Sequence, residues 1–221
     1  MTQALFFDFD GVILESAGIK TRAFEKLFEK DFPERISEIV RYHKKNMGIS
    51  RFVKFRRIYE DILGLPLSEN EEKRLGLRFA EIVSGEVLRA PFVAGLEDFL
   101  KKNSMKYSMF VISGTPEAEL REIARRRGLF EYFREWRGTP GEKKEILADL
   151  LLRYRWKPGE AAYVGDADSD YEACLATGVQ FIARVGGDGL DARRCEHRIR
   201  DLTELEKILS QLQNNKGSEV R

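Results

Sequence analysis

The chain has 221 residues, enough for one large domain or for a core with a smaller insert, and its 38 lysine and arginine residues balance 37 aspartate and glutamate residues to leave a net charge of +1. Because so small a net charge gives no overall field that would attract nucleic acid or an anionic membrane, we expect neither as a partner. No apolar run approaches the roughly 18 residues of a membrane span, and the N-terminus lacks the basic region and cleavage site of a signal peptide, so we expect a cytoplasmic protein.

The first predicted element is a short buried strand, Ala4 to Phe7, followed by a turn at Gly11. Asp8 and Asp10 come directly after this strand, where the chain opens into a loop. Alternate residues of an extended chain point the same way, so both carboxylates can reach one centre. Ligands bind at the carboxyl edge of a parallel sheet, and two like charges held this close there require a cation, a proton or solvent.

Residues 16 to 84 are predicted to be helical almost throughout. Ile36, Ile39, Val40 and His43 repeat at the spacing of one helix face, and a similar repeat begins at Phe52. The pattern predicts a unit of four helices. His43 is one of two histidines in the chain, which are too few and too far apart in the sequence to suggest a zinc site.

Beyond residue 85 short apolar runs alternate with amphipathic helices. This alternation predicts an α/β fold with a Rossmann-like three-layer core, in which helices cover both faces of a parallel sheet. The first strand belongs to this sheet, so we expect a core domain of residues 1–15 and 85–221 and an inserted helical-bundle domain of residues 16–84. The later strands are predicted at Tyr107–Ile112, Phe133–Trp136, Ala161–Val164 and Val179–Ala183, with helices at Glu117–Arg127, Lys143–Arg155 and Ser169–Thr177 between them.

Two later strand ends also carry polar side chains. Ser113 and Gly114 precede a helix, where a hydroxyl and free backbone N–H groups form a natural anion site, although the same residues also make an ordinary helix cap. Asp166, Asp168 and Asp170 lie in one turn, which fits either a hard-cation site or a solvated acidic turn.

Lys143 and Lys144 begin another predicted helix, where the partial positive charge of the helix N-terminus disfavours a cation. A lysine in that position is expected to serve another group. Together the aspartate pair, the hydroxyl, the lysine and the acidic turn make the set that phosphoryl transfer through an aspartyl-phosphate requires. That reaction needs a carboxylate nucleophile, a magnesium ion, donors to the phosphoryl oxygens and a second acid for the leaving oxygen.

These motifs resemble those of the haloacid dehalogenase superfamily, in particular its subfamily IA of β-phosphoglucomutase-like and phosphoglycolate phosphatase-like members, and the resemblance covers nearly the whole chain. It rests on D-x-D-G-V from Asp8 to Val12, on Ser113 after an apolar strand, on Lys143 in G-T-P-x-x-K, and on G-D-x-x-x-D ending at Asp170. Each motif is weak alone, but all four in order at strand ends make a specific match.

The resemblance implies that Asp8 is the nucleophile and Asp10 the general acid and base. It further implies that Asp8, the Asp10 carbonyl and Asp166 hold Mg²⁺. Asp170 would support these ligands or pair with Lys143.

By the same resemblance Ser113 and the N–H of Gly114 bind the transferring phosphoryl group, and Lys143 neutralises it. The helical insertion resembles the family's cap, which closes over the site, excludes water and selects the substrate. Arg51 stands where β-phosphoglucomutase-like members grip the distal phosphate or anion, and the alternative is a solvated arginine at a helix start. Lys54, one turn on, is a weaker candidate for the same role and is expected to be a surface lysine.

We therefore expect an enzyme, a phosphoric monoester hydrolase that uses Mg²⁺ to hydrolyse a small phosphorylated metabolite such as a sugar phosphate or a phosphoglycolate-like compound. Lys20 stands where the mutases of the group carry a histidine, which favours hydrolysis. A mutase of the β-phosphoglucomutase type and a non-catalytic binding protein on the same fold stay open as alternatives. Whether Lys20 and Arg51 contact the substrate is also open, as is the choice between monomer and homodimer. Cys174 and Cys195 lie in no metal-binding spacing and are expected to be reduced.

Overall fold

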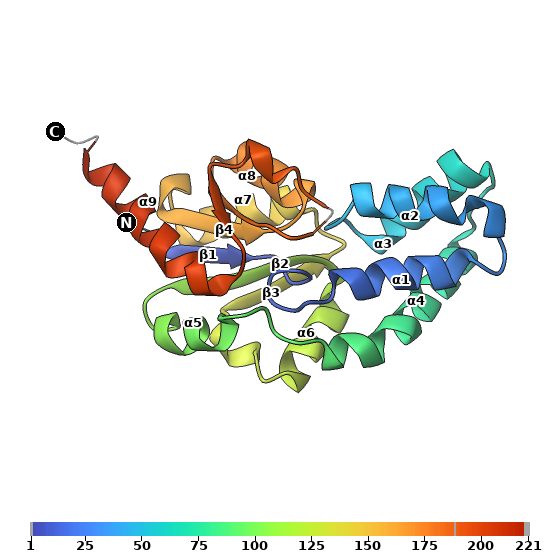
Figure 1. The fold of residues 1–221 in the computed structure, drawn as a ribbon, viewed down its shortest axis with the longest axis horizontal. Helices are drawn as coiled ribbons and strands as arrows, with labels where there is room; N and C mark the ends of the chain where they lie inside the picture. Colours follow the sequence, from blue (N-terminus) through green and yellow to red (C-terminus); the bar gives the residue numbers. More distant parts are fainter. Residues whose placement is uncertain (1, 188, 219–221) are drawn as a thin grey trace.

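The computed structural model describes residues 2–187 and 189–218, and its centre is one six-stranded sheet in the order β3-β2-β1-β4-β5-β6 (Figure 1). Each neighbouring pair of strands is parallel, so the carboxyl ends of the strands lie at one edge of the sheet. The strands are β1 (Ala4–Phe7), β2 (Ser108–Pro116), β3 (Glu135–Thr139), β4 (Ala161–Gly165), β5 (Gln180–Arg184) and β6 (His197–Ile199).

Helices cover both faces of this sheet, as the alternating pattern predicts. Leu5 and Phe7 of β1 belong to the apolar cluster shared with α5, α6 and α9, whereas Ala4 and Phe6 belong to the cluster shared with α7 and α8. All four side chains are fully buried, and each of the three larger ones contributes about 1.5–3 kcal/mol to stability. These helices are α5 (Leu96–Asn103), α6 (Glu117–Arg126), α7 (Lys143–Tyr154), α8 (Asp168–Thr177) and α9 (Leu205–Ser218).

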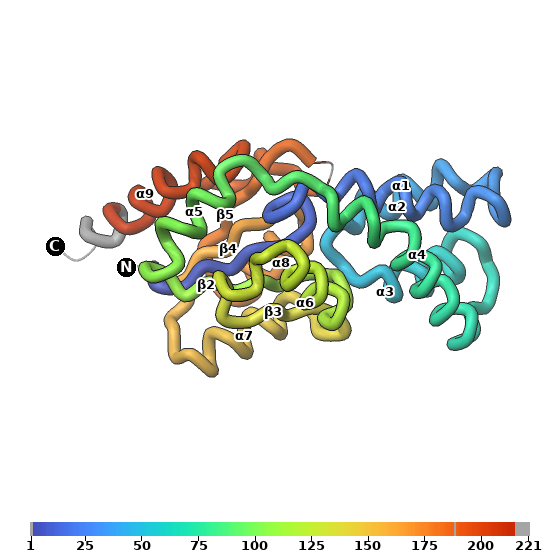
Figure 2. The backbone as a smooth tube through the Cα atoms, turned by 90° about the horizontal axis from the view of Figure 1, so that it is seen from below, coloured from blue at the N-terminus to red at the C-terminus, as the bar shows by residue number. Residues whose placement is uncertain are grey.

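The remaining helices form the insert, by which we mean α1 to α4. Figures 1 and 2 show that the insert lies beyond the carboxyl edge of the sheet, beside the core. Its helices are α1 (Ala17–Phe28), α2 (Ile36–Lys45), α3 (Arg51–Arg57), which continues into a π-helical turn at Ile58–Leu63, and α4 (Glu69–Arg89). Among the described residues, none of the helices combines the length and apolar character needed to cross a membrane.

The chain passes between the core and the insert at two adjacent crossings. The N–H of Glu15 donates to the Pro91 carbonyl at 3.0 Å, and the N–H of Val93 donates to the Ile13 carbonyl at 3.0 Å. The return crossing therefore comes after α4 ends at Arg89, later than the boundary expected at residue 85. Gly85 lies inside α4 and does not end it. A single glycine lowers the stability of a helix by only about 1 kcal/mol, which the packing of a long helix can offset.

Candidate active site

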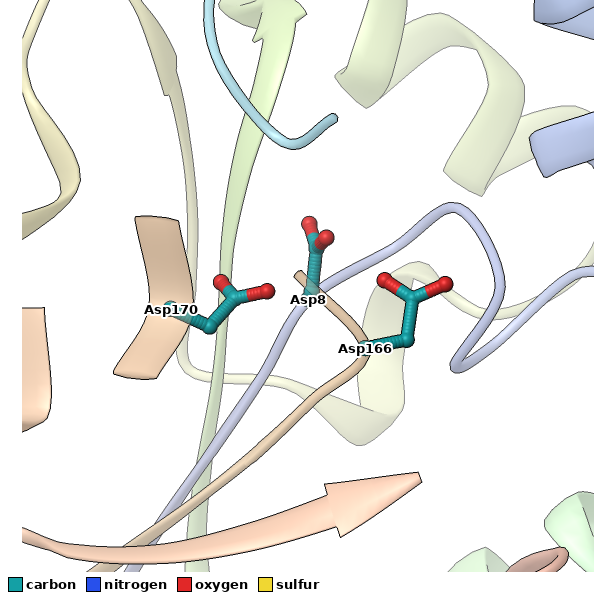
Figure 3. Close-up of side chains that lie close together, drawn as sticks. All are labelled: Asp8, Asp166 and Asp170. Carbon is teal, nitrogen blue, oxygen red and sulfur yellow. The ribbon is translucent and has the colours of Figure 1, made fainter. Parts of the chain in front are cut away.

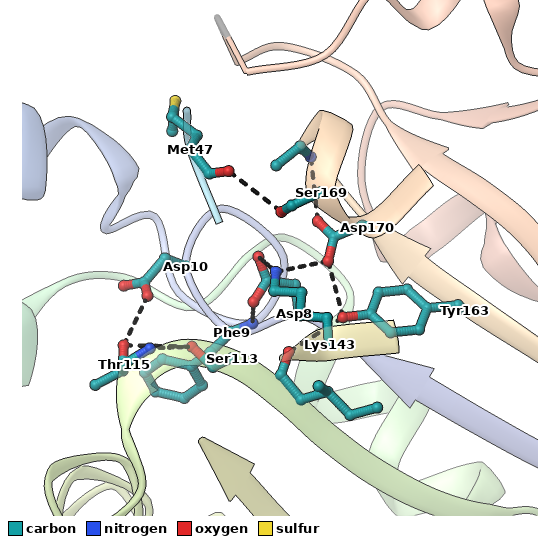
Figure 4. Close-up of polar contacts among 12 residues, drawn as sticks. Asp8, Phe9, Asp10, Met47, Ser113, Thr115, Lys143, Tyr163, Ser169 and Asp170 are labelled. Atoms are coloured by element: carbon teal, nitrogen blue, oxygen red, sulfur yellow. Dashed lines mark hydrogen bonds and ion pairs between the residues drawn. The ribbon is translucent and has the colours of Figure 1, made fainter. Parts of the chain in front are cut away.

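The carboxyl edge of the sheet brings the candidate residues together below the insert. Asp8 follows β1, Ser113 lies near the end of β2, and Asp166 follows β4. Lys143 and Asp170 come from the first turns of α7 and α8. Figure 4 shows the side chains of Asp8, Ser113, Lys143 and Asp170 converging on one centre, although they are separated widely in the sequence, and Figure 3 shows Asp166 beside Asp8.

Three buried carboxylates form the floor of the site. Asp8, Asp166 and Asp170 each place an oxygen within 4.8 Å of the others (Figure 3). Burial raises the pKa of Asp8 to about 7, although the charge of Lys143 opposes the shift. Burial and the charges of Asp8 and Asp170 raise the pKa of Asp166 well above its usual value. Asp8 and Asp166 therefore need compensating positive charge in order to ionise together.

Lys143 supplies one part of that charge. Its Nζ lies 3.0 Å from Asp8 Oδ2 and 2.6 Å from Asp170 Oδ1 (Figure 4). Burial disfavours its charged form, but the carboxylates of Asp170 and Asp8 outweigh burial and raise the pKa of Lys143. Lys144 is instead exposed and pairs with Glu142 at 3.0 Å. The structure thus brings Lys143, and not Lys144, to the aspartates.

The donor set fits a hard divalent cation. Oδ2 of Asp166 is buried without a hydrogen-bond partner among the described residues, and Asp8 offers a neighbouring carboxylate. Asp170 is already engaged by Lys143, by Tyr163 Oη at 2.8 Å and by the Ala167 N–H at 3.2 Å, which suits it to a supporting position. The Asp10 carbonyl as a further ligand stays a prediction.

Gly11 makes room for this carboxylate. Its φ is +79°, a conformation that favours glycine, and a Cβ atom on this residue would lie 2.0 Å from Asp166 Oδ2. The glycine of the D-x-D-G motif is therefore required both for the turn and for the approach of Asp166, which follows β4, to Asp8.

Asp10 points to a different set of partners from Asp8. Its Oδ1 accepts a hydrogen bond from Ser16 Oγ at 2.6 Å, and its Oδ2 accepts from Lys20 Nζ and from Thr115 Oγ1, the latter at 3.2 Å. Burial opposes ionisation of Asp10, but Lys20 and these hydrogen bonds lower its pKa overall. Lys20 also donates to Thr115 Oγ1 at 2.6 Å, so α1 of the insert is tied to both Asp10 and β2.

Ser113 and Gly114 occupy the end of β2 facing the insert. The Ser113 hydroxyl is buried and accepts the Thr115 N–H at 3.2 Å. Gly114 lies so close to the loop between α2 and α3 that a Cβ atom would be 2.5 Å from the Gly48 carbonyl oxygen. The neighbouring loop residue Met47 accepts a hydrogen bond from Ser169 Oγ at 3.2 Å (Figure 4). The insert therefore sits closely against the strand end that carries the expected phosphoryl-binding groups.

Arg51 is buried at the start of α3 and is bound to the core. Its guanidinium forms a bidentate salt bridge with the carboxylate of Glu119, in the first turn of α6. The distance from Arg51 Nη1 to Glu119 Oε2 is 2.9 Å. It also lies over the rings of Phe52 and Phe79, at 5.3 and 5.2 Å from their centroids. Arg51 borders the site cavity, but in this arrangement its anionic partner is Glu119.

The expectation that Lys54 is a surface lysine is wrong. It is 3% exposed, and its Nζ lies 3.1 Å from His43 Nδ1. Burial, followed by the charge of Lys20, lowers the pKa of Lys54 to about 7. Burial also lowers the pKa of His43 to about 2. The position of His43 on the apolar helix face is the one sequence signal that its ring is buried, and no comparable signal marks Lys54.

A cavity of about 50 Å³ lies between the insert and the strand ends. Its walls are formed by the catalytic candidates of the core and by charged and aromatic residues of the insert. The core contributes Asp8, Asp10, Ser113, Gly114 and Asp166. The insert contributes Lys20, Phe24, His43, Arg51, Lys54 and Phe79. The two cysteines, which are buried and free, lie away from it.

Most of the chain is similar to known proteins. A family model described as haloacid dehalogenase-like hydrolase matches residues 2–178. A phosphoglycolate phosphatase of Synechococcus elongatus is 25% identical over 198 residues, 84% of each chain, and a phosphorylated carbohydrates phosphatase of Thermotoga maritima is 24% identical over 193 residues, 83% of this chain and 85% of the relative. The solved β-phosphoglucomutase of Clostridium difficile has a similar fold, with a TM-score of 0.77 and 19% identity over the whole of both chains.

Proposed function

The chain belongs to the haloacid dehalogenase-like hydrolase family, and we propose that it is a magnesium-dependent phosphatase that hydrolyses a small phosphorylated metabolite through an aspartyl-phosphate. The observation that carries the proposal is the buried carboxylate of Asp8, held beside Lys143 and Asp166 with a second carboxylate, Asp10, two residues on. The names of the two phosphatase relatives support the chemistry and a substrate that is a sugar phosphate or phosphoglycolate-like.

In the proposed first step an oxygen of Asp8 attacks phosphorus, and Asp10 donates a proton to the leaving oxygen. Lys143, the Ser113 hydroxyl and the Gly114 N–H stabilise the oxygens of the transferring phosphoryl group. Mg²⁺ held by Asp8 and Asp166 supplies the positive charge that offsets repulsion between the carboxylate and the phosphoryl group. In the second step Asp10 takes a proton from water as the water oxygen attacks phosphorus, and the bond between phosphorus and the Asp8 oxygen breaks, which releases phosphate and restores the Asp8 carboxylate.

We propose that the insert is a cap domain, and that the arrangement described here is its closed position. Lys20 joins α1 to Asp10, Arg51 joins α3 to Glu119, and Ser169 of the core joins the Met47 carbonyl. A cap held in this way excludes bulk water during phosphoryl transfer and must open to admit substrate.

A mutase of the β-phosphoglucomutase type is the alternative, and the two activities differ in their products. The likeness to a solved β-phosphoglucomutase concerns the fold, whereas Lys20 occupies the hinge position at which the resemblance implies a histidine in mutases. A mutase would convert a sugar monophosphate into an isomer without net phosphate release. Chromatography of the products beside a phosphate assay distinguishes the two.

The experiment that tests the proposal measures phosphate release from a panel of phosphorylated metabolites with and without Mg²⁺. We expect release that requires Mg²⁺ and is abolished in Asp8→Asn. Release that survives in Asp8→Asn would overturn the proposed intermediate. A panel that yields no phosphate and no isomer would favour a non-catalytic binding protein.

A further inference from the structure

Lys54 is a buried lysine whose charge has no anionic partner. Within the part of the chain that the structure describes, no carboxylate lies at ion-pair distance from its Nζ, which contacts His43 Nδ1 and lies 5.3 Å from the centroid of the Phe24 ring. Burying an unpaired ammonium is unfavourable by several kcal/mol. A lysine kept in this position and facing the site cavity therefore points to a ligand that supplies the missing negative charge.

His43 is held as a hydrogen-bond acceptor for this lysine. The Thr21 hydroxyl donates to the Ala17 carbonyl at 3.2 Å, so its oxygen is free to accept from His43 Nε2, which lies 3.2 Å away. With its proton on Nε2, the imidazole presents a lone pair at Nδ1 to Lys54. The ring is further fixed by stacking on Phe24, with 4.3 Å between the ring centroids. The insert thus fixes the direction of the Lys54 side chain without neutralising its charge.

The other cations that the insert brings to the cavity are already paired. Arg51 is bound by Glu119 of α6, and Lys20 is bound by Asp10. Lys143, on the core side, is bound by Asp8 and Asp170. Lys54 therefore differs from its neighbours in having its positive charge available to a bound molecule.

We propose that Lys54, oriented by His43, is a specificity-determining residue that binds a second negatively charged group of the substrate, at the end away from the transferred phosphoryl group. This inference rests on the proposed phosphatase function, in which the phosphoryl group lies between Asp8, Ser113 and Lys143. We infer that the substrate is the phosphomonoester of a short hydroxy acid, whose carboxylate is the second negatively charged group.

The size of the cavity supports a short substrate. A volume of about 50 Å³ has room for about three to five water molecules, which is less than a phosphomonoester of even two carbons occupies, so the insert must stand further from the core when substrate is bound. A short ester requires a smaller displacement of the insert than a six-carbon sugar phosphate does.

The electrostatics of the cavity also favour an anion at Lys54. The charged or titratable groups that act on it are His43 of α2, Lys20 of α1, Lys143 of α7, and Asp8 and Asp10 after β1. A carboxylate at Nζ would offset both the burial and the repulsion from Lys20 that lower the pKa of this lysine to about 7. Binding above pH 7 is therefore accompanied by proton uptake.

The test compares two ligands of nearly equal shape, phosphoglycolate and its amide, phosphoglycolamide, which lacks the carboxylate charge. Calorimetric binding to Asp8→Asn, in which turnover is blocked, is expected to favour phosphoglycolate about 10- to 100-fold, as for one charged hydrogen bond. Lys54→Met in the same background is expected to abolish this preference and Lys54→Arg to retain part of it. Lys73→Met, an exposed lysine of α4, is the matched control and should leave the preference unchanged.

Equal affinities of Asp8→Asn for the two ligands, or a preference that survives in Lys54→Met, would overturn the inference. If Lys54→Met fails to fold, the Asp8→Asn protein with Lys54 intact is used instead. Calorimetric titration of this protein with each ligand at pH 8, in two buffers of different ionisation enthalpy, measures the number of protons taken up on binding. Proton uptake with phosphoglycolate and none with the amide supports the role of Lys54, and equal uptake with both overturns it. Hydrolysis of the two esters is assayed separately with wild-type protein and Mg²⁺. If phosphoglycolate binds more tightly than its amide but neither ester is hydrolysed, the phosphatase proposal is contradicted and the anion-binding role of Lys54 is still supported.

Discussion

The ammonium of Lys143 and the carboxylate of Asp8 are buried together, with 3.0 Å between Nζ and Oδ2. Asp170 lies on the other side of the ammonium, 2.6 Å away. One cation therefore serves both the proposed nucleophile and a second buried acid, so we expect its removal to affect stability as well as activity.

We expect Lys143→Met to destabilise the protein by about 3 kcal/mol at pH 8, because two buried carboxylates lose their shared partner. Urea unfolding in the absence of divalent cations measures this. Lys144→Met, on the exposed side of the same helix turn, should leave stability nearly unchanged. Equal losses in the two variants would contradict the buried pairing.

Mg²⁺ is expected to stabilise the folded protein through Asp166, whose Oδ2 is buried without a partner among the described residues. At 100 times its dissociation constant a cation adds about 2.7 kcal/mol to the free energy of unfolding. Thermal unfolding with and without Mg²⁺ should show this increase in wild type and not in Asp166→Asn. Asp168→Asn removes a half-exposed carboxylate, paired with Arg194, from the neighbouring turn and should keep the response. A response preserved in Asp166→Asn would place the cation elsewhere.

Gly11→Ala is expected to abolish phosphate release, because its Cβ atom would lie 2.0 Å from Asp166 Oδ2 and displace that carboxylate. Gly64→Ala is the matched control: Gly64 also has a positive φ, of 65°, but a Cβ atom on this residue would have nothing within 4 Å of it. Both variants should lose about 1 kcal/mol of stability from backbone strain. The measurement is kcat beside the free energy of unfolding, and similar kcat values in the two variants would refute the steric explanation.

The stability of wild type should rise between about pH 7 and pH 10 more steeply than that of Lys54→Met. Burial lowers the pKa of Lys54 to about 7, so above that pH the folded state releases a proton that the unfolded state keeps until its ordinary pKa near 10.5. Stability rises with pH wherever the unfolded state binds more protons, by at most about 1.4 kcal/mol per pH unit for one group. Chemical unfolding at several pH values gives the slopes, and parallel slopes would show that Lys54 titrates normally.

Glu119→Gln should loosen the contact between α3 and α6 by removing the anionic partner of Arg51. Glu119 is one-third exposed, so we expect a change of about 1 kcal/mol, or about fivefold faster amide hydrogen exchange in α3. Glu122→Gln, an exposed position on the same helix, should leave the exchange rate unchanged. Unaltered exchange in Glu119→Gln would mean that other contacts hold the insert.

The sequence predicts most of the core because its signals are local. Ala4 to Phe7 is an uninterrupted apolar run before two aspartates, and the structure confirms a strand with these bounds and places Asp8 at its end. Lys143 could be assigned because its motif fixes its distance from a strand end. The sequence does not predict β6, since three residues, His197–Ile199, are too few to show a periodic pattern.

The contacts of the insert could not be predicted, because they join residues that are distant in the chain. Arg51 and Glu119 are 68 positions apart, and neither has a sequence neighbour that reveals the pairing. Lys54 is a polar residue in a helix, where exposure is the usual expectation, and the position of His43 on an apolar helix face indicates its burial but not its partner. Their burial follows from the approach of α2 and α3 to α1, which only the assembled fold shows.

The order of strands in the sheet has a consequence for synthesis of the protein. β1 leaves the ribosome before both of its neighbours in the sheet, β2 and β4, the second of which ends at Gly165. The helices of the insert, by contrast, find their partners within residues 17–89. The apolar strand β1 therefore stays unpaired until β2, which ends at Pro116, has been made, and it lacks its second neighbour until β4 has been made, while the insert can already fold. A chain that stops before β4 would leave that strand exposed on one side and prone to aggregate.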